Sequence, residues 1–385
     1  MRPLPPRGLR RLCFMAGVAA VFGAASADAQ EGTTSPPWRL DLTAGVGYDD
    51  NIRFTPSMES AVSGRLGAGL TRLMRSSRAN LTLGASGEGS AYRESPEFNR
   101  INYSANLSAS YLISPRSTVR IGDSFSKGYT GGSPLLIDAG LFFPRTVSST
   151  NDASIEASHQ ISRRWNWTVS ARHRVAYFDS TLLNDGSSFI GRADLSWTSA
   201  PESPIGLYYE FGRMSPGGRP SFNLHGATLR TGRRFGEKFS AHLELGARTL
   251  ISQRTESSRV VPTGAAGFAV RSGKQTIEAG AFRSVSEAFG LGRLQVRSAA
   301  SLRFARTLTS RVALGLNANL SRSRDPSGAA GLSFVTGVLD GDLKFRLAKD
   351  VEFSAAGGYR RLDPIATAHT HSRFLSLSLR VGQNW

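Results

Sequence analysis

The sequence predicts an all-β protein, a transmembrane, antiparallel, up-and-down β-barrel of about eighteen strands, with about sixteen also possible. Three observations predict this fold. Apolar and polar residues alternate along most of the chain, and short and long connections alternate between the candidate strands. Beyond residue 29, no run of about 20 apolar residues could cross a bilayer as a helix.

The alternation has the period of a β-strand. Between Trp38 and Tyr48 every even-numbered residue is apolar, whereas the odd-numbered residues are Arg, Asp, Thr and Gly. Successive side chains of a strand point to opposite faces, so one face of this segment is suited to lipid and the other to water. The same pattern recurs in segments 79–85, 101–111, 165–171, 205–211, 239–247, 312–320 and 375–381. Asp123 interrupts the alternation of its segment, and 331–346 predicts a switch of register.

The connections between these segments alternate in length, which is typical of barrels in the outer membrane. Short connections lie at 74–78, 112–117, 162–164, 233–238, 272–274, 306–310 and 348–350, and longer ones at 49–61, 88–100, 127–151 and 362–372. This order predicts an even number of strands with both termini in the periplasm. A soluble β-sandwich or propeller is the alternative, but a propeller should repeat a motif about every 40–50 residues, and we find none.

The two ends of the chain carry candidate targeting signals. Residues 1–29 predict a cleaved signal peptide, because four arginines and the apolar run Leu12–Ala25 precede the small-residue site Ala27-Asp28-Ala29. Residues 30–385 then form a single barrel domain, and export places it in the outer membrane of a Gram-negative-type bacterium. The last strand predicts a signal for the barrel assembly machinery, made of Leu377, Leu379, Val381 and Trp385.

The chain is strongly basic, with a formal net charge of +18. Removing residues 1–29 takes away four Arg and one Asp, which leaves 43 basic and 28 acidic residues and a net charge of +15. Because the protein is expected to be exported, the anionic partners we expect are outer-membrane lipid, lipopolysaccharide or an acidic polysaccharide, and not nucleic acid. The oligomeric state is not predicted.

Two groups of arginines are candidate functional residues. The first group forms a basic rim at the short periplasmic turns: Arg75, Arg78, Arg116, Arg163, Arg164, Arg233 and Arg234. The second group has the lumen-facing parity: Arg39, Arg65, Arg120, Arg172, Arg174 and Arg192. On one interpretation both groups attract anionic solutes, which predicts weak anion selectivity. On the other, the rim residues only meet lipid phosphates.

The longest loop, 127–151, contains two apolar runs that are unusual for a solvated loop. We predict that it folds inward and narrows the pore, with packing against a neighbouring protomer as the alternative. The candidate constriction residues are Pro134, Leu135, Leu136, Ile137, Leu141, Phe142 and Phe143.

Catalytic and metal-binding interpretations have little support. His369 and His371 are separated by one residue and could in principle bind a metal, but no cysteine and few carboxylates lie near them in the sequence. Asp49-Asp50-Asn51 offers oxygen ligands for calcium, although a polar loop that caps the first strand explains it better. No nucleophile and base are placed to form a triad. We therefore expect no enzyme activity, no cofactor and no metal site.

The opening strand resembles that of the β-barrel porin type 2 family. Ala44-Gly45-Val46-Gly47-Tyr48-Asp49-Asp50-Asn51-Ile52, with Thr55-Pro56 after it, is similar to the family's Gly-Tyr-Asp-x-Asn stretch, and the turn 112–118 resembles its recurring Pro-Arg turn. The resemblance implies an outer-membrane channel for small solutes or for an exported exopolysaccharide. A structural or adhesive barrel, whose loops bind external ligands, remains the alternative.

Overall fold

The structure is a computed structural model, which describes residues 38–53, 58–129, 146–181, 183–198, 203–217, 220–253, 257–326, 333–364 and 370–384. These residues form eighteen strands and one short 3₁₀ helix, η1 (Pro96–Phe98). The strands are β1 Arg39–Asp49, β2 Ala61–Arg75, β3 Ala79–Tyr92, β4 Arg100–Ser114, β5 Ser117–Tyr129, β6 Val147–Gln160, β7 Trp165–Phe178, β8 Gly186–Thr198, β9 Pro204–Ser215, β10 Phe222–Phe235, β11 Phe239–Ser252, β12 Ser258–Ser272, β13 Gln275–Ala288, β14 Arg293–Thr307, β15 Val312–Arg324, β16 Phe334–Ala348, β17 Val351–Pro364 and β18 Thr370–Asn384.

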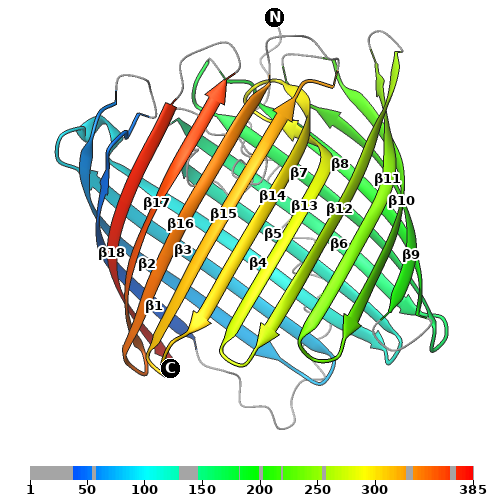
Figure 1. The fold of residues 1–385 in the computed structure, drawn as a ribbon, viewed down its shortest axis with the longest axis horizontal. Helices are drawn as coiled ribbons and strands as arrows, with labels where there is room; N and C mark the ends of the chain where they lie inside the picture. Colours follow the sequence, from blue (N-terminus) through cyan, green and yellow to red (C-terminus); the bar gives the residue numbers. More distant parts are fainter. Residues whose placement is uncertain are drawn as a thin grey trace, which may run out of the picture.

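The strands form one closed sheet. Each strand pairs antiparallel with its neighbour in sequence, and β1 also pairs with β18, from Arg39 opposite Asn384 to Asp49 opposite Phe374. Figure 1 shows the resulting barrel, with the short turns at one end, where β18 also ends. The predicted up-and-down barrel of about eighteen strands is confirmed. Within the described ranges, no helix is long and apolar enough to cross a membrane.

The predicted alternation becomes a difference between the two faces of the wall. Side chains of one parity point outward and are exposed, as in Leu66 and Ile101, which are 71% and 72% exposed. The opposite parity carries polar side chains such as Ser86 and Ser104, whose hydroxyls are 2.8 Å apart. Cross-strand partners share a face, so one apolar outer face and one polar inner face continue around the barrel.

The two irregular segments keep their places in the sheet. Asp123 lies on the outer face of β5, where its carboxylate accepts a hydrogen bond of 2.7 Å from the amide of Asn151. The register switch predicted within 331–346 is wrong, because β16 keeps one register with β15 throughout and with β17 as far as Arg346. The single shift, between Arg346 and Ala348, accompanies the short turn.

Candidate functional site

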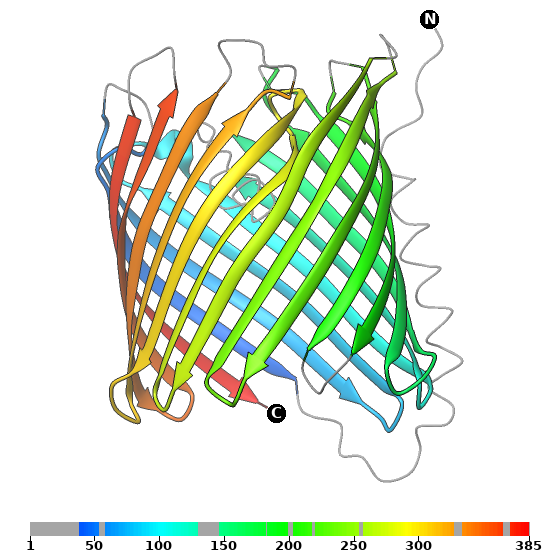
Figure 2. The same ribbon diagram turned by 45° about the vertical axis from the view of Figure 1, so that its right-hand side comes forward.

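One hairpin leaves the wall at the end opposite the short turns. Strand β13 pairs with β12 only as far as Arg283, which lies opposite Gly264, although β12 extends to Ser258. On the other side of the hairpin, the ladder between β14 and β15 ends at Val296, opposite Arg324, although β14 begins at Arg293. Residues 284–295 therefore remain a hairpin, yet they have no ladder with the strands on either side. We call them the inner hairpin; β13 and β14 are yellow in Figures 1 and 2.

The tip of the inner hairpin reaches the far side of the barrel. Gly290 and Asn184 exchange two backbone hydrogen bonds of 2.9 Å, and Asn184 lies in the connection between β7 and β8. Neither of those strands neighbours β13 or β14 in the sheet. The hairpin consequently crosses the lumen instead of extending the wall.

Apolar side chains hold the tip against the inner wall. Phe289 is 1% exposed and clusters with Ala288 and with Ala176 of β7. Gly186 makes this contact possible, because a Cβ at that position would lie 2.4 Å from Cδ1 of Phe289. Burial of a side chain the size of Phe or Leu stabilises by about 1.5–3 kcal/mol, so the contact favours a docked hairpin.

A second apolar cluster supports the base of the hairpin. Val285 and Leu294 are 4% and 2% exposed, and they pack with Val296. The wall supplies Met214, Leu224, Leu250 and Val261, with Ile190 and Phe222 at the edge of the cluster. The four wall residues have the inward parity of β9 to β12, where polar residues were expected. This departure was visible in the sequence, and it is the pattern from which the inner hairpin could have been predicted.

Charged groups form a second set of contacts with the hairpin. Arg248 of β11 donates to the carbonyl of Val285 at 3.1 Å and to the carboxylate of Glu210 at 2.6 Å. Glu287 of the hairpin is 3% exposed and lies 3.7 Å from the guanidinium of Arg174. The hairpin is thus held on the wall by packing and by ion-pair geometry at the same time.

The predicted lumen arginines lie on the inner face of the wall, where several pair with carboxylates. Arg120 contacts Glu156 at 2.6 Å, and Arg192 contacts Asp194 at 3.0 Å. Arg39 pairs with Asp41 of the same strand. The remaining members of the group are Arg65, beside Gly47, and Arg172 and Arg174, which share Asp152. Other arginines of the same parity were missed, although parity alone would have found them; they include Arg230 with Asp194, Arg248 with Glu210 and Arg380 with Asp41.

The predicted basic rim lies at the short-turn end. Arg75 and Arg234 lie at or next to the ends of β2 and β10, and the turns between strands carry Arg78, Arg116, Arg163 and Arg164. Arg233 is beside Arg234 in β10, with its guanidinium 4.9 Å from the ring centroid of Phe235. The rim and the inner hairpin therefore lie at opposite ends of the lumen.

Several predicted residues lie outside the described ranges. These are the signal peptide at 1–29, the constriction residues Pro134, Leu135, Leu136, Ile137, Leu141, Phe142 and Phe143, and Trp385. Leu377, Leu379 and Val381 lie in β18, opposite Val46, Ala44 and Leu42 of β1.

The Asp49-Asp50-Asn51 stretch has the geometry of a strand cap. The carboxylate of Asp49 accepts from the backbone N–H of Asn51 at 2.9 Å and from the hydroxyl of Ser372 at 2.7 Å. The amide of Asn51 in turn donates to the carbonyl of His371. These contacts tie the loop after β1 to β18. Over the described residues, no three His, Cys, Asp or Glu side chains are grouped as a metal would require.

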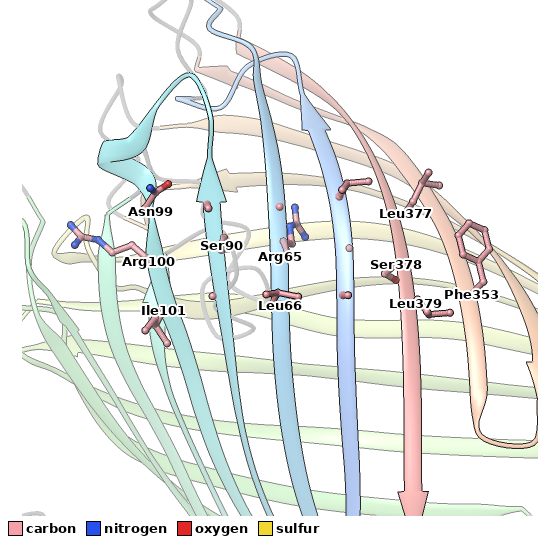
Figure 3. A pocket seen from close by; sticks show the side chains of 16 residues that line it. Arg65, Leu66, Ser90, Asn99, Arg100, Ile101, Phe353, Leu377, Ser378 and Leu379 are labelled. Carbon is pink, nitrogen blue, oxygen red and sulfur yellow. The ribbon is translucent and has the colours of Figure 1, made fainter.

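One depression of the described residues is on the outer face and does not belong to the lumen. It has a volume of about 1070 Å³ and extends over β18 and β1 to β4. Figure 3 shows Leu379 of β18, Leu66 of β2 and Ile101 of β4 along this outer groove. Glycines such as Gly64 form its floor, so it is a place where the barrel surface is thin and apolar.

Comparisons with known proteins support the fold. No family model matches the chain, and no curated protein matches it, so the family resemblance of the first strand stays a prediction. Among solved structures, OccAB2 of Acinetobacter baumannii aligns with 92% of this chain and 100% of its own, with a TM-score of 0.51 and 9% identity. This chain shares the fold of OccAB2. OccAB4 of the same organism aligns with 93% of this chain and 100% of its own, at 10% identity and a TM-score of 0.49. The outer membrane protein OpdK of Pseudomonas aeruginosa aligns with 90% of this chain and 99% of its own, at 12% identity and a TM-score of 0.47.

Proposed function

We propose that the protein is an outer-membrane channel for small solutes, in which the inner hairpin narrows an aqueous lumen. The observation that carries the proposal is the passage of residues 284–295 through the lumen, where the hairpin packs on the apolar inner face of β9 to β12 and its tip reaches the β7–β8 connection. Barrels of about 16–18 strands enclose an aqueous channel unless something fills it. The fold that the chain shares with OccAB2 agrees with this function.

A constricted lumen favours small solutes over an exported polysaccharide. A polymer would have to pass the inner hairpin, which Phe289 and Leu294 hold inside the lumen. It also favours a channel over a purely adhesive barrel, since a segment that could serve as an external loop is buried in the lumen.

Weak anion selectivity is part of the proposal. Two arginines, Arg192 and Arg230, share the single carboxylate of Asp194, and Arg172 and Arg174 share Asp152. At Asp194 two arginines thus meet one carboxylate, and such a local excess of fixed positive charge raises the local concentration of anions.

Reversal potentials in planar bilayers test the selectivity. We expect an anion-selective sign in a low-salt gradient that fades towards 1 M salt, where charges are screened within about 3 Å. A cation-selective sign contradicts it. Changing Arg163, Arg164, Arg233 and Arg234 to Gln separates the two roles of the rim. Lost selectivity assigns the rim to the pore mouth, and unchanged selectivity with poorer membrane retention assigns it to lipid phosphates.

Outer-membrane location and assembly by the barrel machinery are proposed together with the channel. The outer face of β18 is apolar along Leu377, Leu379 and Val381, which a water-soluble barrel would not tolerate. Removing Trp385 should lower the yield of heat-modifiable barrel in outer-membrane fractions. Normal accumulation without Trp385 contradicts the proposed assembly signal.

A further inference from the structure

Four arginines gather on the outer face of β13 to β17. Arg283 lies opposite Ser298, and Ser298 lies opposite Arg322, so the two arginines are two strand spacings, or about 10 Å, apart in one row. Arg324 follows on β15, and Arg361 occupies the outer face of β17. All four are exposed, and the cross-strand register places them on the same face as the outward Leu302, Leu320 and Leu339.

These arginines have few anionic partners within the protein. The guanidinium of Arg361 pairs with Asp363 at 2.7 Å. Arg283, Arg322 and Arg324 form no ion pair with any carboxylate in the described part of the chain. The patch therefore carries an excess of positive charge on a face that is otherwise apolar.

The row lies at the upper boundary of the apolar belt. Arg322 is ten residues beyond Val312, the first residue of β15, and Arg361 is ten residues beyond Val351, the first of β17. Ten residues span about 33 Å along a strand, or about 25 Å along the axis of a barrel whose strands tilt by about 40°, which is the height of the lipid-facing belt.

The departure of the inner hairpin marks the same level. Above the pair Gly264 and Arg283, strand β12 has no partner on its β13 side. Unpaired backbone groups are excluded from the hydrocarbon, so the hydrocarbon cannot extend far beyond Arg283. The arginine row thus lies where the lipid headgroups begin.

An apolar groove begins directly below the row. It has a volume of about 390 Å³ and includes Arg361 in its lining. Its floor is made of small residues, Ala300, Ala318 and Gly337, and the outward side chains of Leu302, Leu320 and Leu339 border it. A cationic rim above an apolar groove matches an amphiphile with an anionic head and a hydrocarbon tail.

We infer that this face binds a phosphorylated, acylated lipid of the outer leaflet, with its phosphate groups distributed over Arg283, Arg322, Arg324 and Arg361 and an acyl chain in the groove. The inference rests on the proposed outer-membrane location, but not on what the pore conducts. A free phosphate ion would use the arginines alone, and the adjoining groove favours the lipid.

Binding of purified bisphosphorylated lipid A to the delipidated barrel in detergent, followed by native mass spectrometry, tests the arginines. Changing Arg283 and Arg322 to Gln should weaken binding by about fivefold for each arginine, the effect expected for a cation at a charged lipid surface. Arg213 of β9 is the matched control, because it is also exposed on the outer face near the same end. Arg213→Gln should leave binding within about twofold.

Filling the groove tests the acyl chain. A Cβ at Gly337 meets only Cδ1 of Leu320, at 3.9 Å, so Gly337→Leu has room to place its side chain in the groove. We expect it to weaken binding of lipid A. Gly64→Leu is the control, since Gly64 faces open space in the larger groove of Figure 3.

Three results would overturn the inference. They are equal binding by wild type and by the Arg283→Gln, Arg322→Gln variant, equal binding of a neutral diacyl lipid, and displacement of lipid A by an equal concentration of inorganic phosphate. Single-channel conductance of the same variants should match the wild type. A barrel that binds the lipid but does not conduct would contradict the proposed channel and leave the lipid site in place.

Discussion

Two consecutive hairpins of this barrel have equal strand lengths and different fates. Strands β11 and β12 have 14 and 15 residues, as do β13 and β14. The β11–β12 hairpin stays in the wall and is paired from Phe239 to Ile251. The β13–β14 hairpin is paired within itself just as completely, but its outer part crosses the lumen. Local strand propensity therefore does not decide which hairpin leaves the wall.

The difference lies in what the inward face offers. Leu250 and Val261 of the β11–β12 hairpin face the lumen near its outer end, and water would be a poor neighbour for them. Val285 and Leu294 of the inner hairpin cover both residues. In the wall, Glu287 would instead have the outward parity and would lose its contact with Arg174. Tertiary burial thus favours the inward path of the β13–β14 hairpin, and this hairpin shields the inward apolar residues of β11 and β12 from water.

The largest effect should come from removing the inner hairpin. Replacing residues 286–295 with an Asn-Gly turn keeps Val285 opposite Val296, so β13 and β14 stay joined in register, and takes away Phe289 and Glu287. We expect single-channel conductance to rise several-fold, because the segment that crosses the lumen is lost. A barrel that remains heat-modifiable but conducts as the wild type does would rule out the hairpin as the constriction.

A smaller change should loosen the hairpin without removing it. Phe289→Ala leaves a cavity against Ala176 and should weaken docking of the tip by about 3–5 kcal/mol. We expect current traces to fluctuate between two conductance levels. Phe268→Ala removes an equal side chain from the outer face, where Phe268 is 43% exposed, and should give a steady current. A steady current from Phe289→Ala as well would show that packing at the tip does not hold the hairpin.

The charge of the inner hairpin should affect the ion selectivity of the pore more than its conductance. Glu287→Gln removes the carboxylate beside Arg174, while Asp152 remains 3.4 Å from the same guanidinium. We expect a modest shift of the reversal potential towards anions, by about a few millivolts, with conductance little changed. The control is Asp363→Asn, which removes a carboxylate on the outer face, far from the lumen. A shift towards cations would contradict the assignment of Glu287 to the conduction path.

The smallest effect should come from Glu59, in the water-exposed loop between β1 and β2. A hydrogen bond from Arg53, with a second from Ser95, holds the pKa of Glu59 below its usual value. Because the pKa of Glu59 is lower in the folded protein than in the unfolded chain, its ion pair stabilises the loop fully above about pH 4.5, the ordinary pKa of a Glu side chain. This stabilisation is lost as the pH falls through the lowered pKa. Hydrogen exchange of the Ile52 amide, which donates to the carbonyl of Glu59, should lose protection below that pH. A Glu59→Gln barrel should show no such pH dependence, and identical profiles would contradict the role of Glu59.

The alternation of residues predicted the barrel because a strand in a wall has only two environments, lipid and lumen. It correctly placed Arg172 inward and Leu66 outward from parity alone. Parity loses its meaning where a segment leaves the wall, so Val285 and Phe289 could not be assigned to a face by the same rule. The contact of Phe289 with Ala176 joins residues more than a hundred positions apart, and no local pattern encodes it. The apolar residues Leu224 and Leu250 at inward positions were the available indication, and they were not used.

The ladder between β1 and β18 sets the order in which this protein can form. Arg39 and Asn384 lie at opposite ends of the described chain, yet they are partners in the same ladder. Contacts of such long sequence separation form slowly, since nearly the whole chain has to be ordered before they can be made. Until then β1 keeps an unpaired edge, ready to add a strand from another molecule. Until the last strand arrives, the edge of the first strand is therefore the part of the nascent chain most open to pairing with another molecule.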